Sequence, residues 1–183
     1  CYSFYKQLSF LQAFAYGVLE ENILKAVVVG YIIAEKGQLK RFFSRRAIIP
    51  GGMLIGSGTS ESSINFLLVK LKQHLSKDAI YVEFRNYTDY SPYISVFEKN
   101  KFFYKAHLNY QLATTQVDSV FQNLSESKER QIKQTEKAGI YCELSNSYED
   151  IGVFYKLLQT LYNNKVRKPL FPDEFFYKLV SSN

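Results

Sequence analysis

Three basic residues between Ser125 and Gly139 have a spacing that could bind phosphate groups. Arg130, Lys133 and Lys137 follow one another at steps of three and four residues, so on a helix they would share one face. Cationic side chains hold phosphate oxygens through charge-assisted hydrogen bonds, and arginine can donate two at once. Arg167, from a later segment, would extend this face. The pattern predicts a site for a pyrophosphate or an RNA backbone.

The same segment also fits a solvent-exposed connecting helix. Glu126 lies four residues before Arg130, and Glu129 stands in the same relation to Lys133. Pairs in this order stabilise a helix by about 0.2–0.5 kcal/mol each. Ile132 is the one large aliphatic residue of the segment, so little of this helix could be buried. Both interpretations stay open.

Two arginines stand at the ends of predicted strands. Arg46 lies at the end of a basic strand predicted over residues 38–47, and Arg85 ends a strand predicted over 79–85. Ligands of α/β sheets usually bind where strand ends gather. We therefore add Arg46 and Arg85 to the candidate phosphate-binding residues. Arg85 with Asn86 is the stronger pair, because both follow a buried type of strand directly.

The overall composition is that of a folded globular protein. The chain has 183 residues, of which 46% are hydrophobic and 22% charged, unlike a disordered segment. Its formal net charge of +6 suggests an anionic partner, such as a phosphate-rich ligand, nucleic acid or an acidic membrane surface. A basic surface with no such partner explains the charge equally well.

Cysteine and histidine are too few for a disulfide framework or a metal site. The two cysteines, Cys1 and Cys142, lack metal-ligand spacing, and this usage is typical of a reducing cytosol. His74 and His107 lie on unrelated predicted elements, so we expect structural roles for them. The most apolar run, Ala26–Ala34, is far shorter than the ~20 residues that a membrane-spanning helix needs.

The N-terminal third predicts an antiparallel β-meander. Strands are expected over residues 14–20, 26–35 and 38–47, with short polar turns between them. Residues 48–60 contain four glycines and one proline, which predicts a loop. Backbone amides at the start of the following helix could cradle a phosphate. Because the loop lacks both the P-loop ending and the Rossmann spacing, we interpret it as a tight loop.

From Ser60 onward, helices alternate with strands. An amphipathic helix is predicted by apolar residues at steps of three and four, namely Ile64, Leu67, Leu68, Leu71 and Leu75. Thr115 with Asp118, and Ser147 with Asp150, are expected to cap two later helices. The further elements expected are strands over 79–85, 102–112 and 140–144, and helices over 91–99, 115–124, 125–139, 147–161 and from Pro172. This order predicts a mixed α/β (α+β) fold.

Four segments in this order resemble the FemAB-like aminoacyltransferases, the methicillin-resistance-factor or peptidoglycan-bridge family. They are YVEFRN (81–86), FEKNKFFYKAHLNYQL (97–112), SESKERQIKQTEKAGIYCEL (125–144) and FYKLLQTLYNNKVRKPLFPDEFFYKL (154–179). The family consists of two acetyltransferase-like (GNAT) halves. The resemblance implies a near-complete first GNAT-like half over 1–114, linker helices over 115–138, and an incomplete start of a second half over 139–183.

The resemblance also implies a function and partners. It implies transfer of an acyl or aminoacyl group to an amine, in bacterial peptidoglycan or cell-surface polymer biosynthesis. The donor would be aminoacyl-tRNA or acyl-CoA, without a metal cofactor, and the acceptor a phosphorylated muropeptide precursor. We expect a cytoplasmic location with transient association at the inner membrane face, and no stable protein partner.

One departure leaves alternatives open. Members of this family continue well past the last helix of this chain, so the chain is expected to be either a fragment or a truncated, inactive relative. A non-enzymatic module that binds an anion or nucleic acid through its basic face is the competing class.

No catalytic residue is identified by the sequence. It shows no Ser-His-Asp or Cys-His arrangement, which suits direct attack by an amine, since that needs orientation and carbonyl polarisation instead of a protein nucleophile. Glu83 and Tyr104 are candidate proton acceptors, and sequence alone does not rank them.

Overall fold

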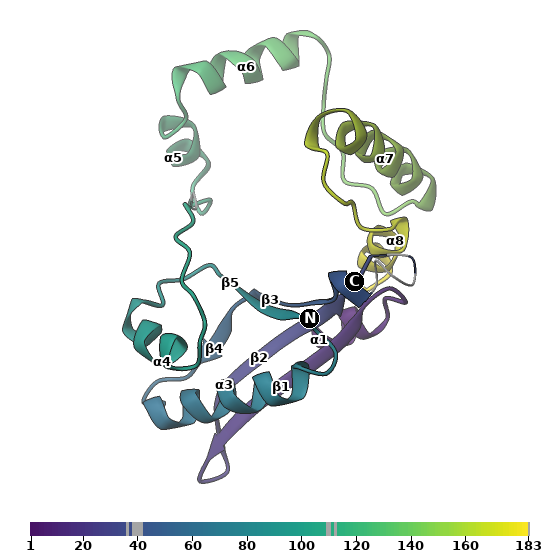
Figure 1. Cartoon of the computed structure of the whole chain (residues 1–183). Helices are drawn as coiled ribbons and strands as arrows, with labels where there is room; N and C mark the ends of the chain where they lie inside the picture. Colours follow the sequence, from purple (N-terminus) through teal and green to yellow (C-terminus); the bar gives the residue numbers. More distant parts are fainter. Residues whose placement is uncertain (36, 38–41, 109–110, 112, 183) are drawn as a thin grey trace. The chain divides into compact units, whose positions relative to one another are not determined.

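The structure is a computed structural model, and it describes the chain except for residues 36, 38–41, 109–110, 112 and 183 (Figure 1). The chain divides into two compact units. The first contains Cys1–Ala106 with Pro169–Asn183, and the second contains His107–Lys168.

A β-hairpin forms the start of the sheet in the first unit. Strands β1 (Gln12–Glu20) and β2 (Ile23–Ile33) pair antiparallel. Glu21 and Asn22 connect them, and both have positive φ angles, 49° and 64°. Two left-handed residues give a turn whose twist matches that of the flanking strands. The predicted hairpin and its turn are therefore confirmed.

Three further strands complete a mixed sheet with the order β1-β2-β3-β5. Strands β3 (Arg46–Gly51) and β4 (Met53–Ile55) both pair antiparallel with β2. Strand β5 (Tyr81–Asn86) pairs in parallel with β3, after the crossover through the helix α3 (Glu61–Leu75). This mixed sheet confirms the predicted α/β fold class.

Helix α3 packs on one face of the sheet and forms the main core. Ser60 caps its N-terminus and accepts a hydrogen bond from the Ser63 backbone N–H at 3.2 Å. The predicted apolar stripe is confirmed, since all five of its residues are buried. Each such side chain contributes about 1.5–3 kcal/mol when it leaves water. From the sheet, the core receives alternate residues of the strands, among them Phe14, Val18, Val28, Ala47, Ile49 and Met53.

Aromatic residues connect the C-terminal segment with the N-terminal helix α1 (Tyr2–Lys6). The rings of Phe4 and Phe175 lie 5.4 Å apart, and those of Phe10 and Phe171 lie 5.7 Å apart. The Ser9 backbone N–H donates to the carboxylate of Glu174 at 2.7 Å. Helix α8 (Asp173–Ser181) therefore packs within the first unit. The predicted division at residues 114 and 138 stays a prediction.

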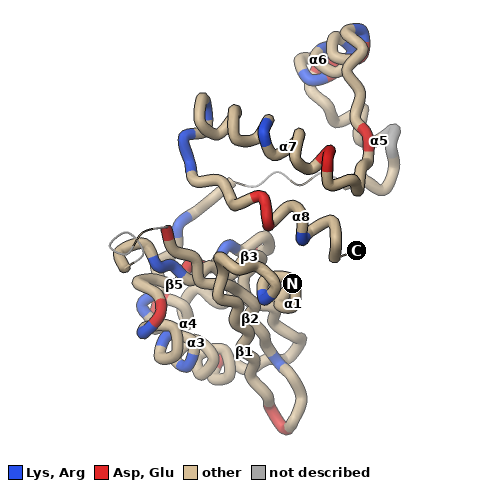
Figure 2. The backbone as a smooth tube through the Cα atoms, turned by 90° about the vertical axis from the view of Figure 1, so that its right-hand side faces the viewer, with Lys and Arg blue, Asp and Glu red and all other residues tan. Residues whose placement is uncertain are grey.

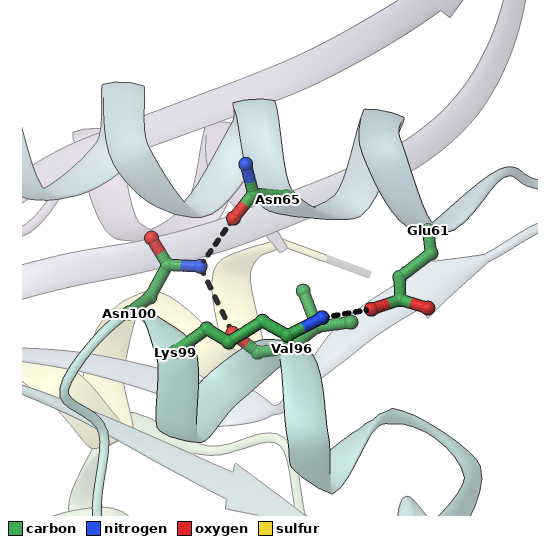
Figure 3. Close-up of polar contacts among 5 residues, drawn as sticks. All are labelled: Glu61, Asn65, Val96, Lys99 and Asn100. Atoms are coloured by element: carbon green, nitrogen blue, oxygen red, sulfur yellow. Dashed lines mark hydrogen bonds and ion pairs between the residues drawn. The ribbon is translucent and has the colours of Figure 1, made fainter.

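Helix α4 (Ile94–Lys99) is joined to α3 by a buried asparagine (Figure 3). The Asn100 side chain donates to Asn65 Oδ1 at 2.8 Å and to the Val96 carbonyl at 2.9 Å. The Asn100 carbonyl accepts from Lys72 Nζ at 2.6 Å. Because buried polar groups are costly when unpaired, this set of bonds fixes where α4 lies on α3.

The second unit contains three α-helices among its described residues. They are α5 (Val117–Gln122), α6 (Glu126–Lys137) and α7 (Tyr148–Leu161), and a π-helical turn, η2 (Tyr162–Val166), follows α7. Helix α6 buries none of its residues and confirms the helix predicted over 125–139, and Gly139 follows it with φ of 71°. Ser147 caps α7 by accepting from the Asp150 N–H at 3.0 Å, which is also confirmed.

Two predictions near the Pro-Gly segment are wrong. Residues 42–44 are helical where a strand was predicted over 38–47, and residues 38–41 lie outside the described part. The predicted loop over 48–60 instead contains β3 and β4, with Ile48 and Ile49 buried. Two of the glycines in this segment lie where β3 ends and β4 begins. From sequence alone, such a break between two strands cannot be distinguished from a loop.

Two predicted strands and one cap in the second half of the chain are also wrong. Residues 103–108 and 140–144 form no strand, although both are rich in aromatic and aliphatic residues. Such a pattern gives a strand only where a partner edge exists; Tyr141 and Leu144 are instead exposed. Helix α5 has Gln116 at its N-cap position where Thr115 was predicted.

Asn100→Ala should lower the free energy of unfolding by about 1–3 kcal/mol. The substitution removes a buried donor, and Asn65 Oδ1 loses the hydrogen bond that it accepts from this donor. Urea unfolding measures the change. Lys99→Ala is the control, since its ion pair with Glu61 is 3.0 Å long between exposed side chains and should be worth at most ~1 kcal/mol. Equal losses in the two variants would contradict a specific fastening role for Asn100.

Candidate functional site

Two adjacent glycines lie between the strands β3 and β4 and interrupt the regular backbone there. Gly51 and Gly52 have φ angles of 85° and 79°, a region that only glycine enters readily. The Gly52 N–H turns back to the Ile49 carbonyl at 3.3 Å. Strand β3 keeps its ladder with β5 up to the pair Gly51–Asn86, whereas β4 pairs with β2. We call the place where β4 leaves β5 the strand divergence; Gly52, Met53, Asn86 and Tyr90 line it.

The Tyr90 hydroxyl occupies the strand divergence and donates a hydrogen bond to the Met53 carbonyl. A Cβ atom added at Gly52 would collide with both Asn86 Oδ1 and the Tyr90 hydroxyl, so these polar atoms lie against the bare glycine backbone. Burial raises the pKa of Tyr90 above its ordinary 10.0. The hydroxyl therefore keeps its proton and remains a donor at neutral pH.

Asn86 Oδ1 is buried and has no hydrogen-bond partner within the described parts of the chain. A buried acceptor without a donor costs about 1–3 kcal/mol. Native structures contain few such atoms, and each calls for an explanation. The strand divergence is therefore the best candidate for a site that receives a hydrogen-bond donor from a ligand.

The segment that carries Tyr90 is held at both ends. On one side it follows β5, whose Phe84 ring packs edge-on against Phe97 of α4 at 5.1 Å. On the other side, the Asp89 carboxylate accepts from the Ser91 backbone N–H at 2.8 Å, at the start of the short 3₁₀ helix η1 (Ser91–Tyr93). Tyr90 therefore lies in a segment bounded by β5 and η1, with its ring 6.2 Å from that of Phe97 in α4.

The predicted residues Arg46 and Arg85 lie on the sheet face opposite α3, where both influence the Tyr31 hydroxyl electrostatically. Burial raises the pKa of Tyr31 against the lowering effect of these guanidinium groups. Arg85 Nε contacts Glu83 Oε1 at 2.7 Å, and this hydrogen bond raises the pKa of Arg85. The carboxylate of Glu83, one of the two suggested proton acceptors, is therefore paired with a guanidinium group. The other, Tyr104, is 67% exposed and lies in an irregular segment.

Arg130, Lys133 and Lys137 line one open hollow on the surface of α6. They share it with Glu126 and Glu129, so the face carries both signs of charge, and Figure 2 marks both signs on this helix. Lys133 Nζ lies 2.5 Å from Glu129 Oε1, and this bond raises the pKa of Lys133.

The other predicted phosphate-binding residues are separate from this hollow. Arg167 follows η2 in the second unit, with a left-handed backbone at φ of 52°. Arg46 and Arg85 belong to the first unit. The structure therefore brings together the three residues of α6, and the phosphate-binding role of all six stays a prediction.

The N-terminus of α3, considered above as a phosphate cradle, holds a carboxylate of the protein itself. Glu20 Oε1 accepts from the Ser60 backbone N–H at 3.2 Å and from the Ser60 and Ser63 hydroxyls at 2.6 Å each. These hydrogen bonds lower the pKa of Glu20 to about 2. Thr59 Oγ1 also donates to the Lys25 carbonyl at 2.9 Å. The Ser60 backbone N–H is thus already bonded within the protein and is not free to bind a phosphate.

Sequence analysis missed Gly52, Met53 and Tyr90. The available signal was the Gly-Gly pair inside an otherwise apolar run, Ile48–Ile55, since glycine within a strand often marks a bulge or a close approach. Tyr90 could not be found this way, because its role depends on a contact with a residue 37 positions away.

No protein-family model and no curated protein matches the chain. Among solved structures, the chain is similar to one described as "Crystal structure of a probable acetyltransferase", at 18% sequence identity and a TM-score of 0.39, over 57% of this chain and 70% of that one. No helix within the described ranges is long and apolar enough to cross a membrane.

Glu20→Gln should reduce the difference in the free energy of unfolding between neutral and acid pH. Because the pKa of Glu20 is lowered from 4.5 to about 2, its carboxylate stabilises the fold fully above pH 4.5, and this contribution disappears as the pH falls through the folded pKa. Urea unfolding at pH 6 and near pH 2 should therefore show a smaller difference for the variant than for the wild type. Glu98→Gln, which removes a carboxylate from α4, is the control, and an identical pH dependence in wild type and Glu20→Gln would contradict this role.

Proposed function

We propose that this chain is an N-acyltransferase of the FemAB-like kind, which transfers an acyl or aminoacyl group to an amine. The strand divergence is the observation that carries the proposal. There, the edge of β4 lies beside Asn86 and Tyr90 without a ladder to β5 among the described strands.

The chemistry of amine acylation fits such an edge. Attack on an ester or thioester carbonyl is accelerated by N–H donors that stabilise the developing oxyanion and by correct placement of the amine. An unpaired strand edge presents backbone N–H and C=O groups in a fixed row. No protein nucleophile is needed, which agrees with the lack of a recognisable triad in the sequence.

The finer assignment comes from the sequence segments that resemble the FemAB-like family. One of them, Tyr81–Asn86, is strand β5, which lines the strand divergence. We propose acyl-CoA or aminoacyl-tRNA as the donor and a phosphorylated muropeptide precursor as the acceptor. The reaction would then serve bacterial peptidoglycan or cell-surface polymer synthesis, with transient association at the inner membrane face.

The hollow on α6 is proposed to bind phosphate of the acceptor or of a tRNA donor. Lys133 would exchange Glu129 for a phosphate oxygen, and charge-assisted bonds to phosphate are strong enough to compete with one exposed ion pair. A non-enzymatic anion- or nucleic-acid-binding module is the second candidate function. The observation that favours it is that α6 buries no residue, so its whole basic face is available to a partner.

Gly52→Ala should lower the rate of acyl transfer from acetyl-CoA to a lysine amide by about tenfold or more, or about 1.4 kcal/mol in the barrier. Its Cβ would collide with Asn86 Oδ1 and the Tyr90 hydroxyl and so fill the strand divergence. The measurement is the initial rate of amide formation, with the amine and the donor both varied.

Gly51→Ala is the matched control. Gly51 has a similar φ of 85°, but a Cβ there would meet only Tyr87 ring atoms at 3.9 Å. An alanine in a left-handed conformation should cost both variants a similar free energy of folding, roughly 1–2 kcal/mol. Only Gly52→Ala also fills the strand divergence. Equal rate losses in the two variants would attribute the effect to backbone strain and not to the site.

Arg130→Ala combined with Lys137→Ala should weaken binding of a phosphorylated ligand at least about fivefold, because two charge-assisted contacts disappear, while the melting temperature stays nearly unchanged. Filter binding of tRNA and of a UDP-linked muropeptide across salt concentrations measures the effect. Lys128→Ala with Lys156→Ala removes the same charge from positions that do not line the hollow. Equal effects of the two double variants would show that only net charge matters.

A further inference from the structure

We propose that Asn86 Oδ1 and the Met53 carbonyl oxygen together bind the amino group of the acceptor, and that the Tyr90 hydroxyl occupies this position when no acceptor is bound. The inference rests on the proposed function and names the atoms that would hold its nucleophile.

The first argument is a count of donors. Two carbonyl oxygens face the strand divergence, and neither can donate a hydrogen bond. A tyrosine hydroxyl has one O–H, which goes to Met53, and the Thr88 side chain is hydrogen-bonded to Tyr90, so Asn86 Oδ1 is left without a donor in the described structure. A neutral primary amine has two N–H groups and one lone pair. It can satisfy both oxygens and still direct the lone pair at a carbonyl carbon.

The second argument is the space. Gly52 is the position where any side chain would collide with Asn86 Oδ1 and with the Tyr90 hydroxyl. Removal of the hydroxyl by a side-chain rotation of Tyr90 therefore leaves a gap beside a bare backbone, bordered by both oxygens. We infer that the end of an alkylamine takes this place, next to the buried Met53.

The third argument concerns selectivity. An alcohol, like Tyr90, offers one donor and would leave one of the two oxygens unmatched. A trimethylated amine offers none. Sites built around buried hydrogen-bonding atoms reject analogues that leave those atoms unpaired. The geometry therefore selects primary amines over alcohols and over quaternary ammonium groups.

The experiment is an NMR titration of the full chain, following the side-chain amide signals of Asn86, which Asn86→Ala identifies by their loss. Nα-acetyl-lysine methylamide is the probe, and its Nε-trimethyl analogue is the matched control. We expect saturable shifts of the Asn86 signals with the amine, and affinity at least about tenfold weaker for the trimethyl analogue. Equal affinity for the two probes, or no shift at Asn86 on binding, would overturn the inference.

Two variants separate binding from folding. Asn86→Leu replaces an unpaired buried acceptor by an apolar side chain of similar shape, so its melting temperature should equal or exceed that of the wild type, while amine affinity falls about tenfold or more. Tyr90→Phe removes the competing hydroxyl and should raise amine affinity several-fold. A fall in melting temperature of Asn86→Leu with unchanged amine affinity would instead make Asn86 a structural residue and overturn the inference.

Acyl-transfer assays distinguish this inference from the proposed function. If the amine binds with the expected selectivity but the wild type forms no amide from acyl-CoA or aminoacyl-tRNA, the amine site stands and the transferase proposal fails. If the wild type forms the amide and Asn86→Leu keeps the same KM for the amine, the transferase stands and the amine site fails.

Discussion

The left-handed backbone at Gly51 and Gly52 is the constraint on which the candidate site depends. The two glycines separate β3 from β4. Both strands pair with β2, but only β3 also pairs with β5, and that ladder ends at the pair Gly51–Asn86. The edge of β4 beside Asn86 has no ladder to β5 among the described strands, so its backbone groups are available to a side chain or a ligand. The Tyr90 hydroxyl donates to one of these groups, the Met53 carbonyl, and this contact places Tyr90 beside Gly52 and Asn86.

Stability and function oppose each other at this place in the fold. An apolar residue at position 86 would avoid the cost of an unpaired buried oxygen, and an alanine at position 51 or 52 would be less flexible in the unfolded chain but strained in the folded one. The core under α3 is regular, with its apolar stripe fully buried. The strand divergence interrupts this regularity, and local rules are often broken at functional sites.

Prediction from sequence succeeded where the evidence was local and periodic. The stripe of α3, the cap at Ser147 and the turn between the first two strands each depend on residues within a few positions of one another, and all three are confirmed. The strands β3 and β4 were missed because glycine and proline are typical of loops as well as of broken strands. The pairing of β3 with β5 and the contact of Tyr90 with Met53 join distant segments, and no local pattern encodes them.

Helix α6 shows why charge spacing alone does not separate a connector from a binding face. A helix of 12 residues with nothing buried is marginal in isolation, so it needs acidic residues in its first turn and a basic one in its last, and Glu126, Glu129 and Lys137 meet that need. Stabilisation of the helix accounts for Lys133, which pairs with Glu129. It does not account for Arg130, which makes no ion pair with the described residues although Glu126 lies four positions before it. An unpaired arginine on an open hollow is the part of the pattern that a connector alone leaves unexplained.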